Sequence, residues 1–271
     1  MTFSKEERIH YILRLAVAMC FIGHGAFGII MKPIWYNYFA VMGIGYGKAT
    51  HLMPLLGCFD ILLGMIVLIY PIRIIPFWLV VWGIVTALFR PLSGEPFGEF
   101  VERAGNFGAP LAWVIFSGGF KWNVKFYFTP IKPSNHLDPK DLNRGILCLK
   151  IIGFFLLAGH GWLNLIEKKG LLNQYEALGF SDPIKIASMV GLLEIVIACS
   201  VLIRPIRPLI LAFFIWKVGT ELFYPKYEIL EWIERGGSYG TLLALWVALG
   251  AKNEISNDQN KVRTYSPVLS Q

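Results

Sequence analysis

Long apolar runs alternate with short polar segments along the chain. A bilayer core about 30 Å thick needs roughly 20 apolar helical residues. Runs of this kind lie at about 11–31, 52–71, 74–90, 104–120, 147–166, 184–203, 206–224 and 236–250. The fourth and eighth runs are short, so we expect neighbouring residues or protein cover to complete them. In none of these runs do apolar and polar residues alternate as they do in the strands of a membrane barrel. The pattern predicts an all-α polytopic membrane protein with about eight transmembrane helices.

Sparse features of the first four runs return in the same order in the last four, about 132 to 136 residues later. They are Gly23-His24-Gly25 with Gly159-His160-Gly161, Gly57 and Asp60 with Gly191 and Glu194, Pro71-Ile72-Arg73 with Pro205-Ile206-Arg207, and Glu102-Arg103 with Glu234-Arg235. Because each copy holds an even number of spans, we predict two parallel four-helix repeats. They occupy 1–120 and 147–252, with a linker at 121–146 and a polar, disordered tail at 253–271.

Composition and charge agree with a lipid environment. The chain has 271 residues, of which 55% are hydrophobic and 16% charged, and its mean hydropathy is +0.56. The net charge is +7, but the cations flank apolar runs and form no nucleic-acid-binding motif. We therefore expect the lipid bilayer as partner and no nucleic acid. Lysine and arginine favour the side of the termini and the linker, which predicts cytoplasmic termini in a bacterial inner membrane.

Four ionisable residues inside the apolar runs are the first candidates for chemistry. His24 lies about 13 residues into its span, roughly 20 Å across, and His160 matches it. Asp60 and Glu194 lie roughly 14 Å deep, where a charged group costs at least ~2.5 kcal/mol. These carboxylates must pair, stay protonated or face water. The alternative interpretation is structural: a histidine bonded within the bundle, and a buried ion pair.

Other polar residues extend this candidate site. Lys217 could meet Glu194 at similar depth, or it could pair at i,i+4 with Glu221, one helical turn further on. The first copy has Gly83 and Ala87 at these two positions, so the copies have diverged in charge. Further candidates for ligand binding or ion pairs are Arg90, Glu102, Arg103, Glu234, Arg235, Trp82 and Trp216. The two Glu-Arg pairs follow predicted short interfacial helices, and we interpret them first as structural clamps.

Each copy resembles a DoxX-type four-helix membrane domain. The resemblance rests on the Gly-His-Gly segments, on the Gly and acid of the second span, on the Pro/Arg turn and on the glycines that open the last span. It covers about residues 11–120 and 147–250. It implies membrane redox chemistry, since the family's namesake is similar to a small subunit of a thiosulfate:quinone oxidoreductase. A fused tandem departs from the usual single four-helix chain.

These patterns lead to one functional prediction and two alternatives. The prediction is a membrane redox subunit, with a partner redox subunit, that binds a quinone-like or other small apolar molecule in the outer half between the repeats. His24, His160, Asp60 and Glu194 would manage protons. Haem held by His24 and His160 is a less favoured cofactor than a quinone. The sequence does not identify a metal. The alternatives are a transporter or channel with a mid-membrane charged site, and a non-catalytic assembly or scaffold protein.

Overall fold

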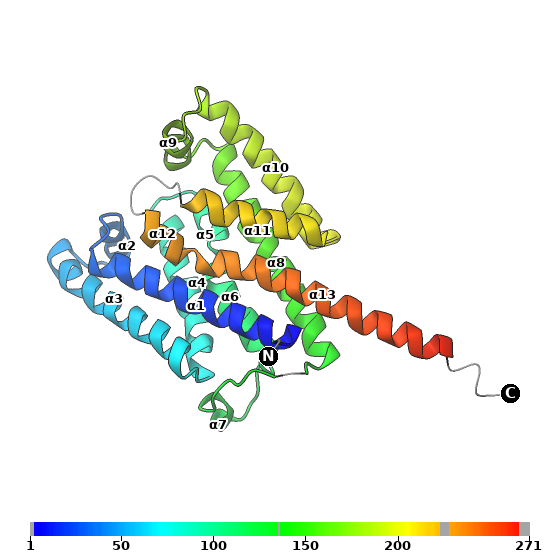
Figure 1. Cartoon of the computed structure of the whole chain (residues 1–271). Helices are drawn as coiled ribbons and strands as arrows, with labels where there is room; N and C mark the ends of the chain where they lie inside the picture. Colours follow the sequence, from blue (N-terminus) through cyan, green and yellow to red (C-terminus); the bar gives the residue numbers. More distant parts are fainter. Residues whose placement is uncertain (1–2, 135, 223–227, 266–271) are drawn as a thin grey trace.

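The chain is all-helical in a computed structural model, which describes residues 3–134, 136–222 and 228–265 (Figure 1). Within these residues the only β-type pairing is an isolated bridge between Ile72 and Pro130. The helices are α1 Lys5–Ile29, α2 Trp35–Val41, α3 Tyr46–Ile69, α4 Ile74–Leu92, α5 Gly98–Glu102, α6 Ala104–Phe116, α7 Val124–Tyr127, α8 Pro139–Leu165, α9 Lys169–Ala177, α10 Pro183–Ile203, α11 Arg207–Glu221, α12 Glu228–Glu234 and α13 Gly236–Tyr265.

Among the described residues, five helices are long and apolar enough to cross a membrane, namely α1, α3, α4, α8 and α10. The other three predicted spans have different lengths. Helix α6 has 13 residues and α11 has 15, whereas α13 has 30. Within the polar tail predicted from residue 253, α13 continues to Tyr265, and residues 266–271 lie outside the described residues. The linker boundary also shifts, because α8 begins at Pro139, where Asp138 caps its first turn.

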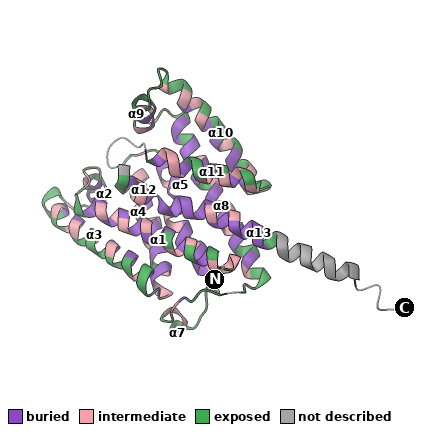
Figure 2. Cartoon of the chain, viewed as in Figure 1, coloured by how far each residue is buried: buried purple, intermediate pink, exposed green. Residues whose placement is uncertain are grey.

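The helices before and after the linker follow a similar order, except that the last one has 13 residues in the first half, α6, and 30 in the second, α13. We call residues 1–120 the first half and residues 147–252 the second half. Helix α1 packs along α3 of its own half and along α13 of the other, and α8 packs along α10 and α6. The short helices cross over too, α5 lying against α8 and α12 against α1. The buried residues therefore concentrate where the two halves meet (Figure 2).

Glycines allow the closest of these helix contacts. A Cβ atom on Gly57 of α3 would overlap the carbonyl oxygen of Gly25 on α1. The second half repeats the contact, because a Cβ on Gly161 of α8 would lie 2.8 Å from the carbonyl oxygen of Gly191 on α10. Small residues let two backbones approach in this way. The contact fixes how the side chains next to these glycines face each other.

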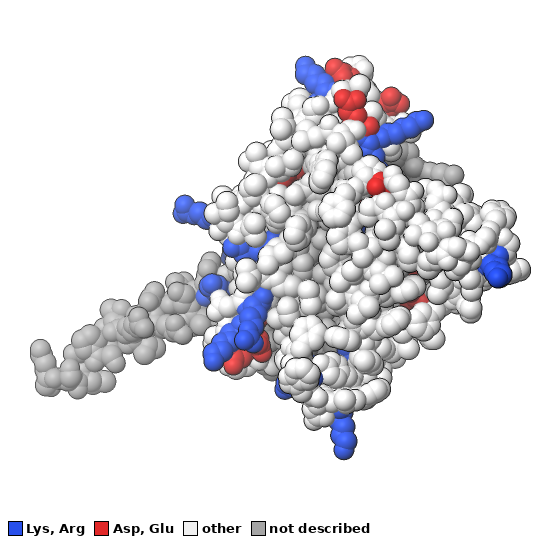
Figure 3. Space-filling model, turned by 180° about the vertical axis from the view of Figure 1, so that it is seen from behind, with Lys and Arg blue, Asp and Glu red and all other residues white. Residues whose placement is uncertain are grey.

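The outer surface is apolar over large areas. Helix α3 exposes Leu55, Phe59 and Leu62, and α10 exposes Leu192 and Val196. Most of the face shown in Figure 3 carries no charged side chain, and the charges that it does show lie toward its margins. An apolar surface of this extent is typical of a protein that contacts lipid.

We expect the Gly57→Ala substitution to destabilise the protein, because the new methyl group meets backbone atoms of α1 that cannot turn aside. Overpacking of this kind costs roughly 1–3 kcal/mol. The measurement is the midpoint of thermal unfolding of the detergent-purified protein. Gly47→Ala, at the start of the same helix, is the matched control, since a Cβ there meets no atom within 4 Å. Equal midpoints for the two variants would contradict the proposed contact.

Candidate functional site

A histidine and a carboxylate face each other where α1 and α3 approach most closely. His24 adjoins Gly25, and Asp60 follows Gly57 by about one turn. The His24 Nδ1 atom lies 2.7 Å from Asp60 Oδ2, and the Trp82 indole of α4 donates to Asp60 Oδ1 at 2.9 Å. The Asp60 residue is only 1% exposed, so both of its oxygens have partners inside the protein. The glycine contact is thus the reason that this pair can form.

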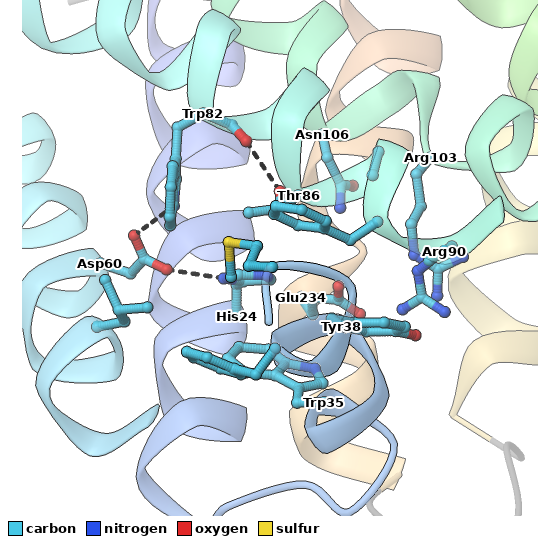
Figure 4. A pocket seen from close by; sticks show the side chains of 15 residues that line it. His24, Trp35, Tyr38, Asp60, Trp82, Thr86, Arg90, Arg103, Asn106 and Glu234 are labelled. Carbon is cyan, nitrogen blue, oxygen red and sulfur yellow. Dashed lines mark hydrogen bonds and ion pairs between the residues drawn. The ribbon is translucent and has the colours of Figure 1, made fainter. Parts of the chain in front are cut away.

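This pair borders a cavity of about 60 Å³ (Figure 4). Trp35 and Tyr38 of α2 form one wall, and the Trp35 ring packs against the His24 ring with 4.6 Å between centroids. Thr86 of α4 and Glu234 of α12 also line the cavity. Most of its remaining wall is apolar, from Phe39, Met42, Leu56, Ala87 and Phe89. The cavity therefore combines aromatic walls with a few polar groups, as small-molecule sites do.

Two guanidinium groups lie on the side of the cavity away from Asp60 (Figure 4). Arg90 Nη1 lies 3.2 Å from Glu95 and 3.3 Å from Glu99, and Arg103 Nη1 lies 2.9 Å from Glu99. The Tyr38 hydroxyl donates to Glu95. A molecule in the cavity would lie between a histidine that can carry a proton and two fixed positive charges.

The equivalent histidine of the second half has different surroundings. His160 Nδ1 lies 2.5 Å from Glu194 Oε2, and Asn164 Nδ2 lies 3.2 Å from His160 Nδ1. Tyr175 donates to Asn164 at 2.8 Å. Where the first half has Gly83 and Ala87, the second has Lys217 and Glu221. These two side chains are almost fully buried and pair at 3.1 Å.

Ion pairs join the two halves along α5 and α12. Lys32, after α1, pairs with Glu231 of α12, and its counterpart Lys168, after α8, pairs with Glu99 of α5 at 2.5 Å. Arg235 reaches Glu102 at 2.6 Å. It also lies 3.0 Å from Glu221. Each cation thus meets a carboxylate that comes from the other half or from a neighbouring helix, which offsets the cost of burying both charges.

Nearby cations keep the carboxylates of the short helices α5 and α12 in the charged form. Burial tends to raise the pKa of Glu99, but the nearby positive charges of Arg103, Lys168 and Arg90 outweigh it, so that this pKa lies below its usual value. Burial opposes ionisation of Glu234 as well, and Arg103, Lys32 and Arg90 lower its pKa from 4.5 to about 2. Both carboxylates are therefore anionic at neutral pH.

Of the two partners expected for Lys217, the structure confirms Glu221 at 3.1 Å. Glu194 is approached by His160 and Asn164 instead. Trp216 is 49% exposed, although its counterpart Trp82 bonds to Asp60. The remaining candidates, among them Arg90, Arg103, Glu102, Glu234 and Arg235, gather around the cavity and the ion pairs between the halves.

Sequence reasoning missed several residues of this region. Lys32 and Lys168 recur at the separation of the histidines, and Glu99 and Glu231 at that of the Glu-Arg pairs. The internal comparison could therefore have identified all four. Asn164 and Tyr175 have no such signal, because the matching positions of the first half are Gly28 and Phe39. Their role depends on the fold alone.

No group of three or more His, Cys, Asp or Glu side chains within the described residues is placed to hold a metal ion. His24 and His160 lie on different helices, α1 and α8, and each is bound to a carboxylate of its own half. Haem ligation by this pair stays a prediction. Comparison of the chain with protein-family models, curated proteins and solved structures finds no match.

We expect Glu102→Gln to lower the free energy of unfolding by about 2–3 kcal/mol, since a hydrogen bond to a charged group contributes roughly 1.5–3 kcal/mol. The remaining partner Glu221 limits the loss at Arg235. Equilibrium unfolding in mild detergent measures the effect. Glu176→Gln, on the exposed side of α9, is the control and should change little. A Glu102→Gln variant as stable as this control would show that the ion pair contributes no net stability.

Acid should weaken the contact between the halves. The pKa of Glu234 is depressed in the folded state, so its contribution to stability is present above about pH 4.5 and disappears as the pH falls toward 2. The thermal midpoint should therefore fall over this range. In Glu234→Gln the fall should be smaller, because the neutral side chain does not titrate. An identical pH profile for the variant and the wild type would contradict the assignment.

Proposed function

We propose that the chain is an integral membrane protein with eight spans, arranged as two parallel four-helix repeats, with both termini and the linker in the cytoplasm of a bacterial cell. Five membrane-length apolar helices support the membrane location. The recurring order of helices on each side of the linker supports the repeats. Lys5 at the start of α1 donates to the Gly250 carbonyl of α13 at 3.2 Å, as expected if both ends lie on one side. The resemblance to DoxX-type domains stays a prediction.

The proposed function is binding of a small planar molecule of the quinone type in the His24 cavity, as part of a membrane redox system. The His24–Asp60 pair on the wall of an aromatic-lined cavity carries this proposal. An apolar slot holds a ring, and a histidine can donate a proton to a ring carbonyl. Under this proposal the Nδ1 atom donates to Asp60, and Nε2 is the nitrogen that passes the proton to the ring.

A quinone takes up two electrons and two protons when it becomes a quinol. The two electrons would come from a partner redox subunit, one proton from His24 and the second from water that enters the cavity. Arg90 and Arg103 would stabilise negative charge on the far side of the ring. The cavity of about 60 Å³ has room for only a few water molecules. A ring therefore enters only when side chains that line the cavity, such as Met42 just after α2, move aside.

A transporter is the second candidate function, and the buried charges in long helices favour it. Asp60 is 1% exposed within α3, and Arg90 lies within α4. Such residues inside membrane-length helices usually mark a pathway for ions or protons. Under this alternative, the same His24–Asp60 pair would relay protons through water in the cavity. Flux into proteoliposomes distinguishes it from ligand binding.

The test is lipid-extract mass spectrometry and absorption spectroscopy of the protein purified in mild detergent. We expect a quinone to co-purify with the wild type and to fall at least about ten-fold in His24→Ala, which removes the proton donor and the ring that packs on Trp35. His160→Ala is the matched control, because its histidine lies in the half where Lys217 and Glu221 occupy the space, and it should retain the quinone.

Each outcome has a separate meaning. Equal loss in both histidine variants would argue against a site in the first half alone. A colourless, quinone-free wild type that drives proton-coupled flux would favour the transporter. If the protein shows neither quinone binding nor proton-coupled flux, and if His24→Ala and His160→Ala only lower its stability, the assembly or scaffold role is favoured.

A further inference from the structure

The first glycine of each Gly-His-Gly segment lets a glutamate of the other half lie beside the histidine. A Cβ atom on Gly23 would lie 2.5 Å from the Cα atom of Glu234, at the end of α12. In the same way, a Cβ on Gly159 would lie 2.8 Å from the Cα atom of Glu102, at the end of α5. Small residues permit backbone approaches of this kind. Each histidine site therefore has a carboxylate that the opposite half contributes.

The two glutamates differ in their partners. Glu102 is held by Arg235 at 2.6 Å and by Arg103 at 3.3 Å. If the repeat were exact, Arg103 would hold Glu234 as Arg235 holds Glu102, but it pairs with Glu99 at 2.9 Å and with Glu102 instead. Within the described residues Glu234 forms no hydrogen bond or ion pair, and the cations around it act only from a distance. The equivalence of the two halves is broken at this carboxylate.

The Glu234 carboxylate is open to the His24 cavity. The residue is only 4% exposed and lines the cavity, and Figure 4 shows it between the His24 ring and the Arg90 guanidinium. Its oxygens are not among the unpartnered buried atoms that lack accessible surface, so a ligand can reach them. Asp60, the other carboxylate of this cavity, already has a partner at each oxygen. The unused acceptor in the cavity wall is therefore Glu234.

This carboxylate requires a hydrogen-bond donor from the ligand. Because its pKa is lowered to about 2, it is anionic at neutral pH and can only accept. A ring that enters the cavity displaces any water beside Glu234 and must donate in place of that water. A quinone has only acceptor oxygens, whereas a quinol has two hydroxyl groups. A bound quinone would thus leave a buried anion without a hydrogen bond, which weakens its binding.

The larger cavity beside the linker, of about 240 Å³, has no such selective feature. Its histidine, His10, accepts a hydrogen bond from the Trp113 indole at 3.2 Å. Its charged wall residues are Glu6, Arg73, Lys132, Asp138 and Asp141. Because carboxylates and cations are mixed there, this wall does not favour a ligand of either charge.

We propose that Glu234 binds the ligand of the His24 cavity by accepting a hydrogen bond from a ring hydroxyl, so that the site holds the quinol form more tightly than the quinone. This inference rests on the proposed function. Tighter binding of the quinol makes a bound quinone easier to reduce, which agrees with electrons arriving from a partner subunit. Since the second half supplies Glu234, the site is complete only when the two halves are packed together.

The first experiment compares three ligands of the wild type. Durohydroquinone, duroquinone and the dimethyl ether of durohydroquinone share one ring, but only the first has hydroxyl donors. Isothermal titration calorimetry of the detergent-purified full chain at neutral pH under argon measures their affinities. We expect durohydroquinone to bind at least about ten-fold more tightly than either of the others. This comparison needs no variant and so does not depend on the folding of one.

The second experiment repeats the titrations with Glu234→Gln. The preference for durohydroquinone over duroquinone should fall at least about ten-fold, because an amide can donate to a quinone carbonyl. Glu231→Gln is the matched control, since Glu231 lies on the same helix and is buried, but does not line the cavity. It should keep the wild-type preference. Circular dichroism checks that both variants are folded.

Two results would overturn the role of Glu234 and leave quinone binding intact. The first is equal or tighter binding of duroquinone or of the dimethyl ether to the wild type. The second is an unchanged preference in folded Glu234→Gln. If none of the three compounds binds, the proposed function fails together with this inference, so that the two failures are distinguishable.

Discussion

A charge buried between the two halves is stable only when an opposite charge reaches it from a neighbouring element, and this constraint shapes the middle of the molecule. Helices α5 and α12 carry carboxylates across to the other half, where Lys168 and Lys32 meet them. Arg235 and Glu102 link the two crossing segments directly. Breaking one buried pair leaves an uncompensated charge. The halves must therefore fold against each other, and neither can bury these charges alone.

Within this common framework the two halves have diverged. The first half has Gly83 and Ala87 on α4 and leaves a cavity beside His24 and Asp60. The second half places Lys217 and Glu221 at these positions, and both side chains are buried and paired. Equivalent positions thus border a cavity on α4 of the first half and form an ion pair on α11 of the second half. This difference is why one half is the stronger candidate for ligand binding, while the other contributes more to the connection between them.

The two cavities differ in the chemistry that they offer. The His24 cavity is small and aromatic, and its histidine is bound to a carboxylate. The cavity beside the linker is larger and mixed in charge, and its histidine accepts a hydrogen bond from an indole. A histidine next to a carboxylate favours proton transfer. The cavity beside the linker has no such pair, because its histidine is bound to an indole.

The sequence alone determined the helical, membrane-type composition and the recurring residues, because apolar run length and internal spacing are local properties of the chain. It also indicated His24, Asp60, Glu102 and Arg235. It could not determine that the last helices of each half pack on the other half, since helix pairing depends on which surfaces fit. For the same reason it left open whether Lys217 pairs with Glu194 or with Glu221, and it did not show that Trp216 is exposed or that α13 continues to Tyr265. Only the tertiary structure decided these points, because side-chain partners are set by distances between segments that lie far apart in the sequence.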